Sequence, residues 1–167
     1  MSIESKFLSK EISAIFWKEG LTLATAESCT AGNVAAAITA VPGSSVFFKG
    51  GIIAYCNEVK KNMLGVKPET LDEFGEVSEE TVVEMVKGVV KTLNVDCAIA
   101  TTGIAGPAGG AAEKPVGTIW IAVCMHEKVV TYKLEEDNGR QQNILAATHK
   151  ALQMLCDLFQ NEEKDAE

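Results

Sequence analysis

The sequence predicts a three-layer α/β/α fold built on a mixed, mostly parallel sheet. Helix-like and strand-like segments alternate along most of the 167 residues, which is typical of parallel strands joined by crossover helices. Two strand-like segments near residue 126 follow each other with a two-residue connection, so we expect one hairpin and one antiparallel strand. Hydrophobic residues make up 47% of the chain, which is enough for one sizeable core.

The first part of the chain supplies two strands and three helices. Apolar residues recur at helical spacing over 8–16, and short apolar runs at 21–26 and 51–56 predict buried strands. Small residues over 31–40 indicate a helix that packs closely on the sheet between those strands. Asn57 is placed to cap the start of the next helix.

The second part of the chain begins with a longer helix over 78–93, whose first residue, a serine, is placed as its cap. A buried strand over 95–102 follows, and then a glycine-rich loop over 103–115. The segments 116–125 and 128–135 are the two strands of the hairpin.

The last predicted helix carries apolar residues on one face from Ile144 to Phe159. Beyond it, residues 162–167 contain four acidic side chains and one lysine. We therefore expect a single domain over 1–161 and a disordered acidic tail over 162–167.

Charge and hydropathy exclude several classes of protein. Lysine and arginine total 15 against 23 acidic residues, and the sequence has no basic stripe, so no nucleic-acid partner is expected. No run reaches 18 apolar residues, and the N-terminus lacks the layout of a signal peptide, which predicts a cytoplasmic protein without a membrane segment. The sequence leaves open whether the protein forms a homo-oligomer.

The spacing of cysteines and histidines argues against a metal centre. The five cysteines contain no CxxC pair, and neither histidine lies at ligand spacing from a cysteine. The loop 103–110 has neither dinucleotide nor lysine-containing phosphate-binding spacing, although its backbone N–H groups can cradle an anion. A plain flexible connection is the alternative for this loop.

Polar clusters follow three predicted strands, at 27–30, 55–60 and 101–110. Because ligands of open α/β sheets bind outside the carboxyl ends of parallel strands, we expect these clusters to converge on one edge. The helix start at Thr30 and Gly32 is an additional candidate anion site, since its first N–H groups lack partners within the helix.

Lys60 is the strongest candidate for a general base on physical grounds. It lies in the first turn of a predicted helix, where the helix dipole disfavours a cation, and burial beside Tyr55 would lower its pKa further. An ordinary solvated lysine is the alternative. Three serines are candidate nucleophiles for such a base, namely Ser28, Ser44 and Ser45. The sharp strand-to-helix turn favours Ser28.

Seven motifs in order span about residues 20 to 160: AESCTAG (26–32), PGSS (42–45), GIIAYCNEVKKNMLGV (51–66), VSEETVVEM (77–85), TGIAGPAGG (102–110), EKPVGT (113–118) and GR (139–140). Together they resemble the CinA C-terminal domain family, in its stand-alone nicotinamide-nucleotide amidase form. The resemblance implies an α/β/α domain that hydrolyses a small-molecule nucleotide, nicotinamide mononucleotide, to nicotinate mononucleotide and ammonia. It implies a Ser/Lys mechanism without metal or organic cofactor.

The resemblance also implies roles for single residues. It makes Ser45 the nucleophile in place of Ser28, with Lys60 as base and Tyr55 as assisting hydroxyl. It implies a phosphate site at Arg140 and at the helix start near Thr30. The residues implied in substrate binding are Glu27, Ser28, Thr30, Gly32, Asn57, Thr102, Gly103, Gly106 and Arg140.

Two positions depart from the family pattern. Ala31 stands where a glycine is usual, and Cys56 stands where a serine is usual. Both are expected to alter pocket shape without removing a proposed catalytic group. Two alternative functions remain at this point: a nucleotide-binding module without catalysis, and an amidohydrolase acting on a different amide. A substrate panel with and without the ribose phosphate separates them.

Overall fold

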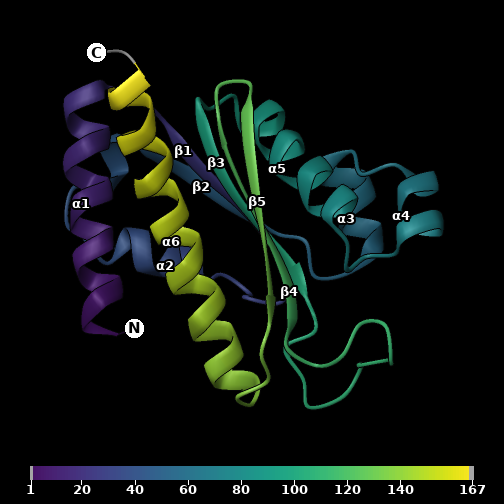
Figure 1. Cartoon of the computed structure of the whole chain (residues 1–167). Coiled ribbons are helices and arrows are strands. Elements are labelled where there is room, and N and C mark those ends of the chain that lie inside the picture. The colour runs from purple at the N-terminus through teal and green to yellow at the C-terminus, as the bar shows by residue number, and fades with distance from the viewer. Residues whose placement is uncertain (1, 166–167) are drawn as a thin grey trace.

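The computed structural model describes residues 2–165, with side chains described for residues 2–161. It confirms the predicted three-layer α/β/α fold (Figure 1). The sheet has the order β2-β1-β3-β4-β5. The strands are β1 (Leu23–Glu27), β2 (Phe48–Ile53), β3 (Cys97–Gly103), β4 (Thr118–Met125) and β5 (Lys128–Glu135). The helices are α1 (Ile3–Glu19), α2 (Asn33–Thr39), α3 (Asn57–Leu64), α4 (Pro68–Phe74), α5 (Glu79–Leu93) and α6 (Arg140–Asp165), with a short 3-10 helix η1 (Ser44–Val46).

The direction of the strands agrees with the predicted mixed, mostly parallel sheet. β1 pairs in parallel with both β2 and β3, whereas β4 is antiparallel to β3 and to β5. Only β4 therefore runs against the other four strands. The carboxyl ends of β1, β2 and β3 consequently lie at one edge of the sheet, where the polar clusters follow them.

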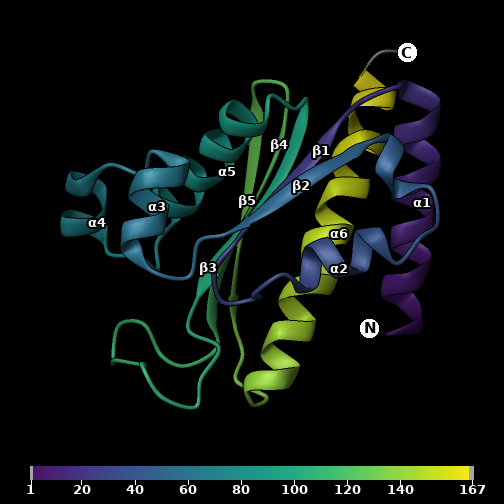
Figure 2. The ribbon, with the colours of Figure 1, turned by 180° about the vertical axis from the view of Figure 1, so that it is seen from behind.

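Each face of the sheet carries its own core. Helices α1, α2 and α6 cover one face, and α3, α4 and α5 lie on the other (Figures 1 and 2). Alternate residues of β4 divide between the two layers: Ile119 and Ile121 are buried toward α6, whereas Ala122 and Cys124 are buried toward α5. Within residues 2–165, no helix is both long and apolar enough to cross a membrane.

Several boundaries differ from the sequence prediction. α3 is capped by Cys56, so Asn57 is its first helical residue rather than its cap. α2 begins at Asn33 instead of residue 31, because Ala31 and Gly32 have positive φ angles of 49° and 92°. α6 extends to Asp165, so residues 162–165 of the expected tail have helical backbone, and residues 166–167 lie outside the described part.

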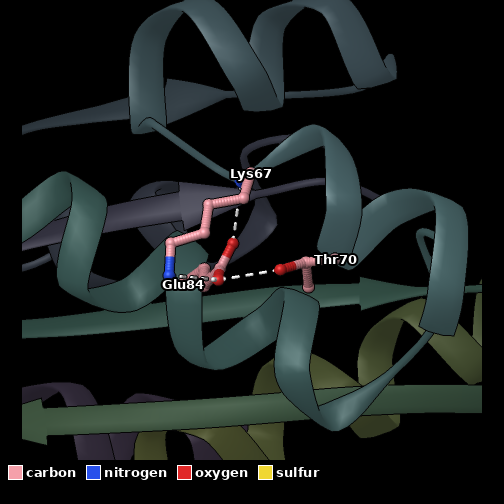
Figure 3. A network of polar contacts seen from close by, with 3 residues as sticks. All are labelled: Lys67, Thr70 and Glu84. Carbon is pink, nitrogen blue, oxygen red and sulfur yellow. Dashed lines mark hydrogen bonds and ion pairs between the residues drawn. The ribbon is translucent and has the colours of Figure 1, made fainter.

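Helix α4 was not predicted, and a carboxylate from α5 supports its start (Figure 3). Glu84 accepts hydrogen bonds from the backbone N–H of Lys67 (2.8 Å) and from the Thr70 hydroxyl (2.9 Å). The Lys67 ammonium lies 3.8 Å from the same carboxylate. Since α4 has no side-chain cap of its own, Glu84 supplies one from outside the helix.

Replacing Glu84 by alanine should lower the free energy of unfolding by about 1–2 kcal/mol, because α4 loses its cap and Thr70 loses its partner. Urea unfolding followed by circular dichroism measures this change. Lys87→Ala removes an exposed charge from the same helix and should change stability by less than about 0.5 kcal/mol. Equal effects from the two substitutions would contradict the capping role.

Candidate active site

A lysine and a serine from two different elements meet at the carboxyl edge of the sheet. Lys60 Nζ, from α3, lies 3.1 Å from the Oγ of Ser28, which directly follows β1. The same ammonium nitrogen donates to the carbonyl of Ala54, just after β2, at 2.9 Å. Only 1% of Lys60 is exposed. This geometry is that of a nucleophile and its base within hydrogen-bond reach.

The parallel pairing of β1 and β2 produces this contact. The Ala54 N–H donates to the Glu27 carbonyl at 2.8 Å, which continues the β1–β2 ladder up to the point where both chains leave the sheet. Ser28 and the start of α3 therefore emerge side by side. α3 packs against α5, and this packing removes Lys60 from water.

Burial lowers the pKa of Lys60 below that of an exposed lysine. The negative charge of Glu76 opposes this effect, with smaller contributions from Cys56 and Cys29. A lysine with a lowered pKa is neutral in a larger fraction of molecules near neutral pH. A neutral amine has a lone pair that can accept the Ser28 proton.

Tyr55 and Arg140 form a second polar group next to the first. Arg140, the first residue of α6, donates from Nη2 to the Tyr55 hydroxyl at 3.1 Å and from Nη1 to the Gly106 carbonyl at 2.8 Å. It thereby joins three segments that are distant in sequence. Because its oxygen accepts from a guanidinium, the Tyr55 hydroxyl is free to donate its own proton elsewhere.

These groups line one pocket of about 390 Å³. Eight of the twelve predicted site residues are among its lining: Ser28, Tyr55, Asn57, Lys60, Thr102, Gly103, Gly106 and Arg140. The lining also includes residues that the sequence reasoning did not single out, chiefly Glu76, Cys29 and Val77. Glu76 precedes the cap of α5 without any motif, and its presence in the pocket follows from the unpredicted turn after α4.

Ser45 is not within hydrogen-bond reach of Lys60 in this chain, and its role as nucleophile stays a prediction. Ser45 lies exposed in η1, before β2, whereas Lys60 follows the other end of that strand. β2 has six residues, so the two ends are separated by roughly 20 Å. Ser44 shares that location. The fold places Ser28, the choice from local geometry, beside the lysine instead.

The predicted anion site at the start of α2 is already filled. The Glu27 carboxylate accepts the backbone N–H groups of Gly32 (3.0 Å), Val34 (3.0 Å) and Ala35 (2.8 Å). It also accepts the Thr30 hydroxyl at 2.7 Å. These donors are therefore occupied by the buried Glu27 carboxylate, and Glu27, Thr30 and Gly32 are not in the lining of the pocket. Their role in substrate binding stays a prediction.

The glycine-rich loop offers backbone donors instead. Gly106 and Gly109 have positive φ angles of 88° and 94°, and both line the pocket. In the described structure, the N–H groups of residues 108–110 have no acceptor within the protein. Successive N–H groups in such a conformation form an anion-binding concavity, and Arg140 stands beside it.

Cys29 is the remaining nucleophilic side chain that is buried at this site. Burial raises the pKa of its thiol to about 12. The thiol therefore stays protonated at physiological pH and is a poor nucleophile. Thr102 likewise has a structural partner, since its hydroxyl donates to the Glu76 carbonyl at 2.6 Å. Ser28 is left as the hydroxyl within reach of Lys60.

Comparison with known proteins identifies the family. The family model described as "CinA C-terminal domain" matches residues 5–159. The chain belongs to the CinA C-terminal domain family. It is 50% identical over 125 residues to a CinA-like protein of Kosmotoga olearia, which is 75% of this chain and 30% of that protein. It is 45% identical over 148 residues to a CinA-like protein of Amoebophilus asiaticus, which is 89% of this chain and 36% of that protein.

A solved structure of the same family has the same fold. The competence/damage inducible protein CihA of Agrobacterium tumefaciens superposes with a TM-score of 0.91 at 40% identity, covering 95% of this chain and 99% of that one. The chain thus matches that protein over nearly its full length, but spans about a third of the length of the two CinA-like relatives.

Proposed function

We propose that this CinA-family chain hydrolyses the carboxamide of nicotinamide mononucleotide to nicotinate mononucleotide and ammonia, with Ser28 as nucleophile and Lys60 as base. The observation that carries the proposal is the 3.1 Å approach of a buried lysine amine to a serine hydroxyl inside a pocket. Such a pair supports acyl transfer, because the amine can take the serine proton and return it to a leaving group.

The reaction proceeds in two halves. In the first, neutral Lys60 keeps one N–H on the Ala54 carbonyl and accepts the Ser28 proton while Oγ attacks the carboxamide carbon. Protonated Lys60 then gives that proton to the departing nitrogen, and ammonia leaves. In the second half, water attacks the acyl-enzyme ester while Lys60 takes a proton from the water. Lys60 then returns that proton to Ser28 Oγ as the ester bond breaks, which releases the acid and regenerates both side chains.

The oxyanion that forms in each half requires positioned donors. Cys29 follows Ser28 and lines the pocket, and in the described part of the chain its backbone N–H has no acceptor in another residue. We assign this N–H as one donor. The Tyr55 hydroxyl, oriented by Arg140, is the assisting group that can donate toward the substrate.

The phosphate of the substrate is assigned to Arg140 and the loop at 106–110. Arg140 uses two of its five N–H donors on Tyr55 and Gly106, which leaves three for a ligand. A guanidinium can hold phosphate with two parallel hydrogen bonds. The free backbone N–H groups of the loop add further donors.

Arg140→Ala should raise KM for nicotinamide mononucleotide by about 10- to 100-fold, because charge-assisted bonds to the phosphate are lost. For the nucleoside without phosphate, the substitution should raise KM much less. Steady-state kinetics on both amides measures the difference. Arg140→Lys should recover part of the loss, and an equal loss on both substrates would contradict the phosphate assignment.

The function itself is tested by incubating purified protein with nicotinamide mononucleotide and following ammonia. Stoichiometric release of ammonia and nicotinate mononucleotide supports the proposal. Folded protein that binds the nucleotide without releasing ammonia would instead be a binding module. Turnover of other amides in preference to this one would make the chain an amidohydrolase of different specificity.

A further inference from the structure

The charges that line the pocket are unevenly distributed. Two cationic side chains, Lys60 and Arg140, line it, and Glu76 is the one acidic side chain that does so within the described residues. Glu76 is exposed, and no ion-pair or hydrogen-bond partner for its carboxylate is found in the described part of the protein. An unpaired carboxylate in the lining of a pocket is available to a ligand cation.

The backbone around Glu76 is held in place although its carboxylate is unpaired. The Glu76 carbonyl accepts the Thr102 hydroxyl at 2.6 Å, which ties the turn to the end of β3. The preceding carbonyl, that of Gly75, accepts the hydroxyls of Ser78 (3.0 Å) and Thr81 (2.8 Å) at the start of α5. The fold therefore holds the backbone that carries this carboxylate at a defined place.

That place is on the Lys60 side of the pocket. The Glu76 carbonyl accepts from Thr102, and the carbonyl of the neighbouring Thr101 accepts the backbone N–H of Ser28, the partner of Lys60, at 2.9 Å. Arg140, in contrast, is anchored to Tyr55 and to the loop carbonyl of Gly106. The pocket thus has a carboxylate near the Ser28–Lys60 pair and a guanidinium beside the phosphate-binding loop. A ligand with a positive ring and a negative phosphate matches this order of charges.

We propose that Glu76 is a specificity-determining residue that selects amides attached to a cationic, N-substituted pyridinium ring over neutral amides of the same shape. The inference rests on the proposed function, since it takes nicotinamide mononucleotide as the ligand. The positive ring lies next to the carboxamide that Ser28 attacks, so a carboxylate on that side of the pocket is placed to attract it.

Binding to a protein that cannot turn over tests the inference directly. In a Ser28→Ala background, calorimetry measures the Kd of nicotinamide mononucleotide and of its reduced dihydropyridine form, which is neutral in the ring but keeps the carboxamide and phosphate. Glu76→Gln should lower the preference for the oxidised over the reduced form by about threefold, the modest effect expected of a charge pair that includes an exposed carboxylate. Glu73→Gln, which removes a charge from α4 outside the pocket, should leave the preference unchanged.

A second readout uses the active enzyme. The charged and titratable groups that act on Lys60 are Glu76, Cys56 and Cys29. Because the Glu76 charge raises the pKa of Lys60, Glu76→Gln should move the acid limb of kcat/KM to lower pH. Glu73→Gln should leave that limb in place.

The outcomes separate the two proposals. If wild-type protein releases no ammonia but Glu76→Gln still changes the preference for the charged ring, the amidase proposal fails and the inference on Glu76 stands. If Glu76→Gln weakens the binding of both ring forms equally, or of neither form, the inference is overturned even when the protein shows amidase activity. Absence of binding of both forms to the Ser28→Ala protein also overturns it.

Discussion

Replacing Ser28 by alanine is expected to reduce ammonia release by about 10⁴-fold or more, whereas Ser45→Ala keeps near-wild-type activity. The reason is positional: Lys60 lies 3.1 Å from Ser28, and Ser45 lies at the opposite end of β2. A nucleophile acts in every turnover and has no substitute within reach. Initial rates of ammonia release on the two variants measure the contrast.

Mass spectrometry of a trapped intermediate identifies the attacking residue independently of rates. The acyl adduct should be on Ser28 in wild-type protein and should disappear in Ser28→Ala. Both alanine variants should keep the wild-type circular dichroism spectrum, since neither opens a large cavity and the Lys60 ammonium retains the Ala54 carbonyl. An adduct on Ser45, or an active Ser28→Ala protein, would return the role to Ser45.

The fold could be predicted because local patterns and topology agreed. The short apolar runs and the hairpin near residue 126 were enough to predict the layers and the one reversed strand, β4. Helix α4 was not predicted, because its one buried residue is Thr70 and its sequence therefore has no apolar stripe of helical spacing. Its stability comes from Glu84, a contact between helices that no local pattern reveals.

Site residues could be predicted where their role follows from their position in a local turn or helix. They could not be predicted where their role depends on contacts that form only when distant segments pack together. The first turn of a helix and the turn after a strand were sufficient to select Lys60 and Ser28, which the structure brings together. The pairing of Ser45 with Lys60 that the resemblance implies is not seen within this chain, because the six-residue strand β2 lies between the two residues. The role of Glu27 depends on the left-handed turn at Ala31 and Gly32, which lets α2 point its N–H groups back at the carboxylate.

Lys60→Met should reduce kcat/KM by about 10³-fold or more, because it removes the base and keeps a side chain of similar length. Lys61→Met is the matched control, because it removes an exposed lysine from the adjacent position of α3, outside the pocket. Its kcat/KM should stay near that of the wild-type enzyme. In the wild-type enzyme, activity should fall as pH decreases through the pKa of Lys60, which burial has lowered. A Lys60→Met enzyme with near-full activity would rule out Lys60 as the base.

The same substitution should change how stability depends on pH. Because burial lowers the pKa of Lys60 in the folded protein, the unfolded chain binds more protons between the folded and unfolded pKa values. The wild-type free energy of unfolding therefore rises with pH through that window, and this contribution is lost as pH falls through the folded pKa. Lys60→Met lacks the contribution, so its stability relative to wild type should be highest at low pH and should decline as pH rises. Urea unfolding at several pH values measures this difference, and a difference independent of pH would mean that Lys60 titrates as an exposed lysine.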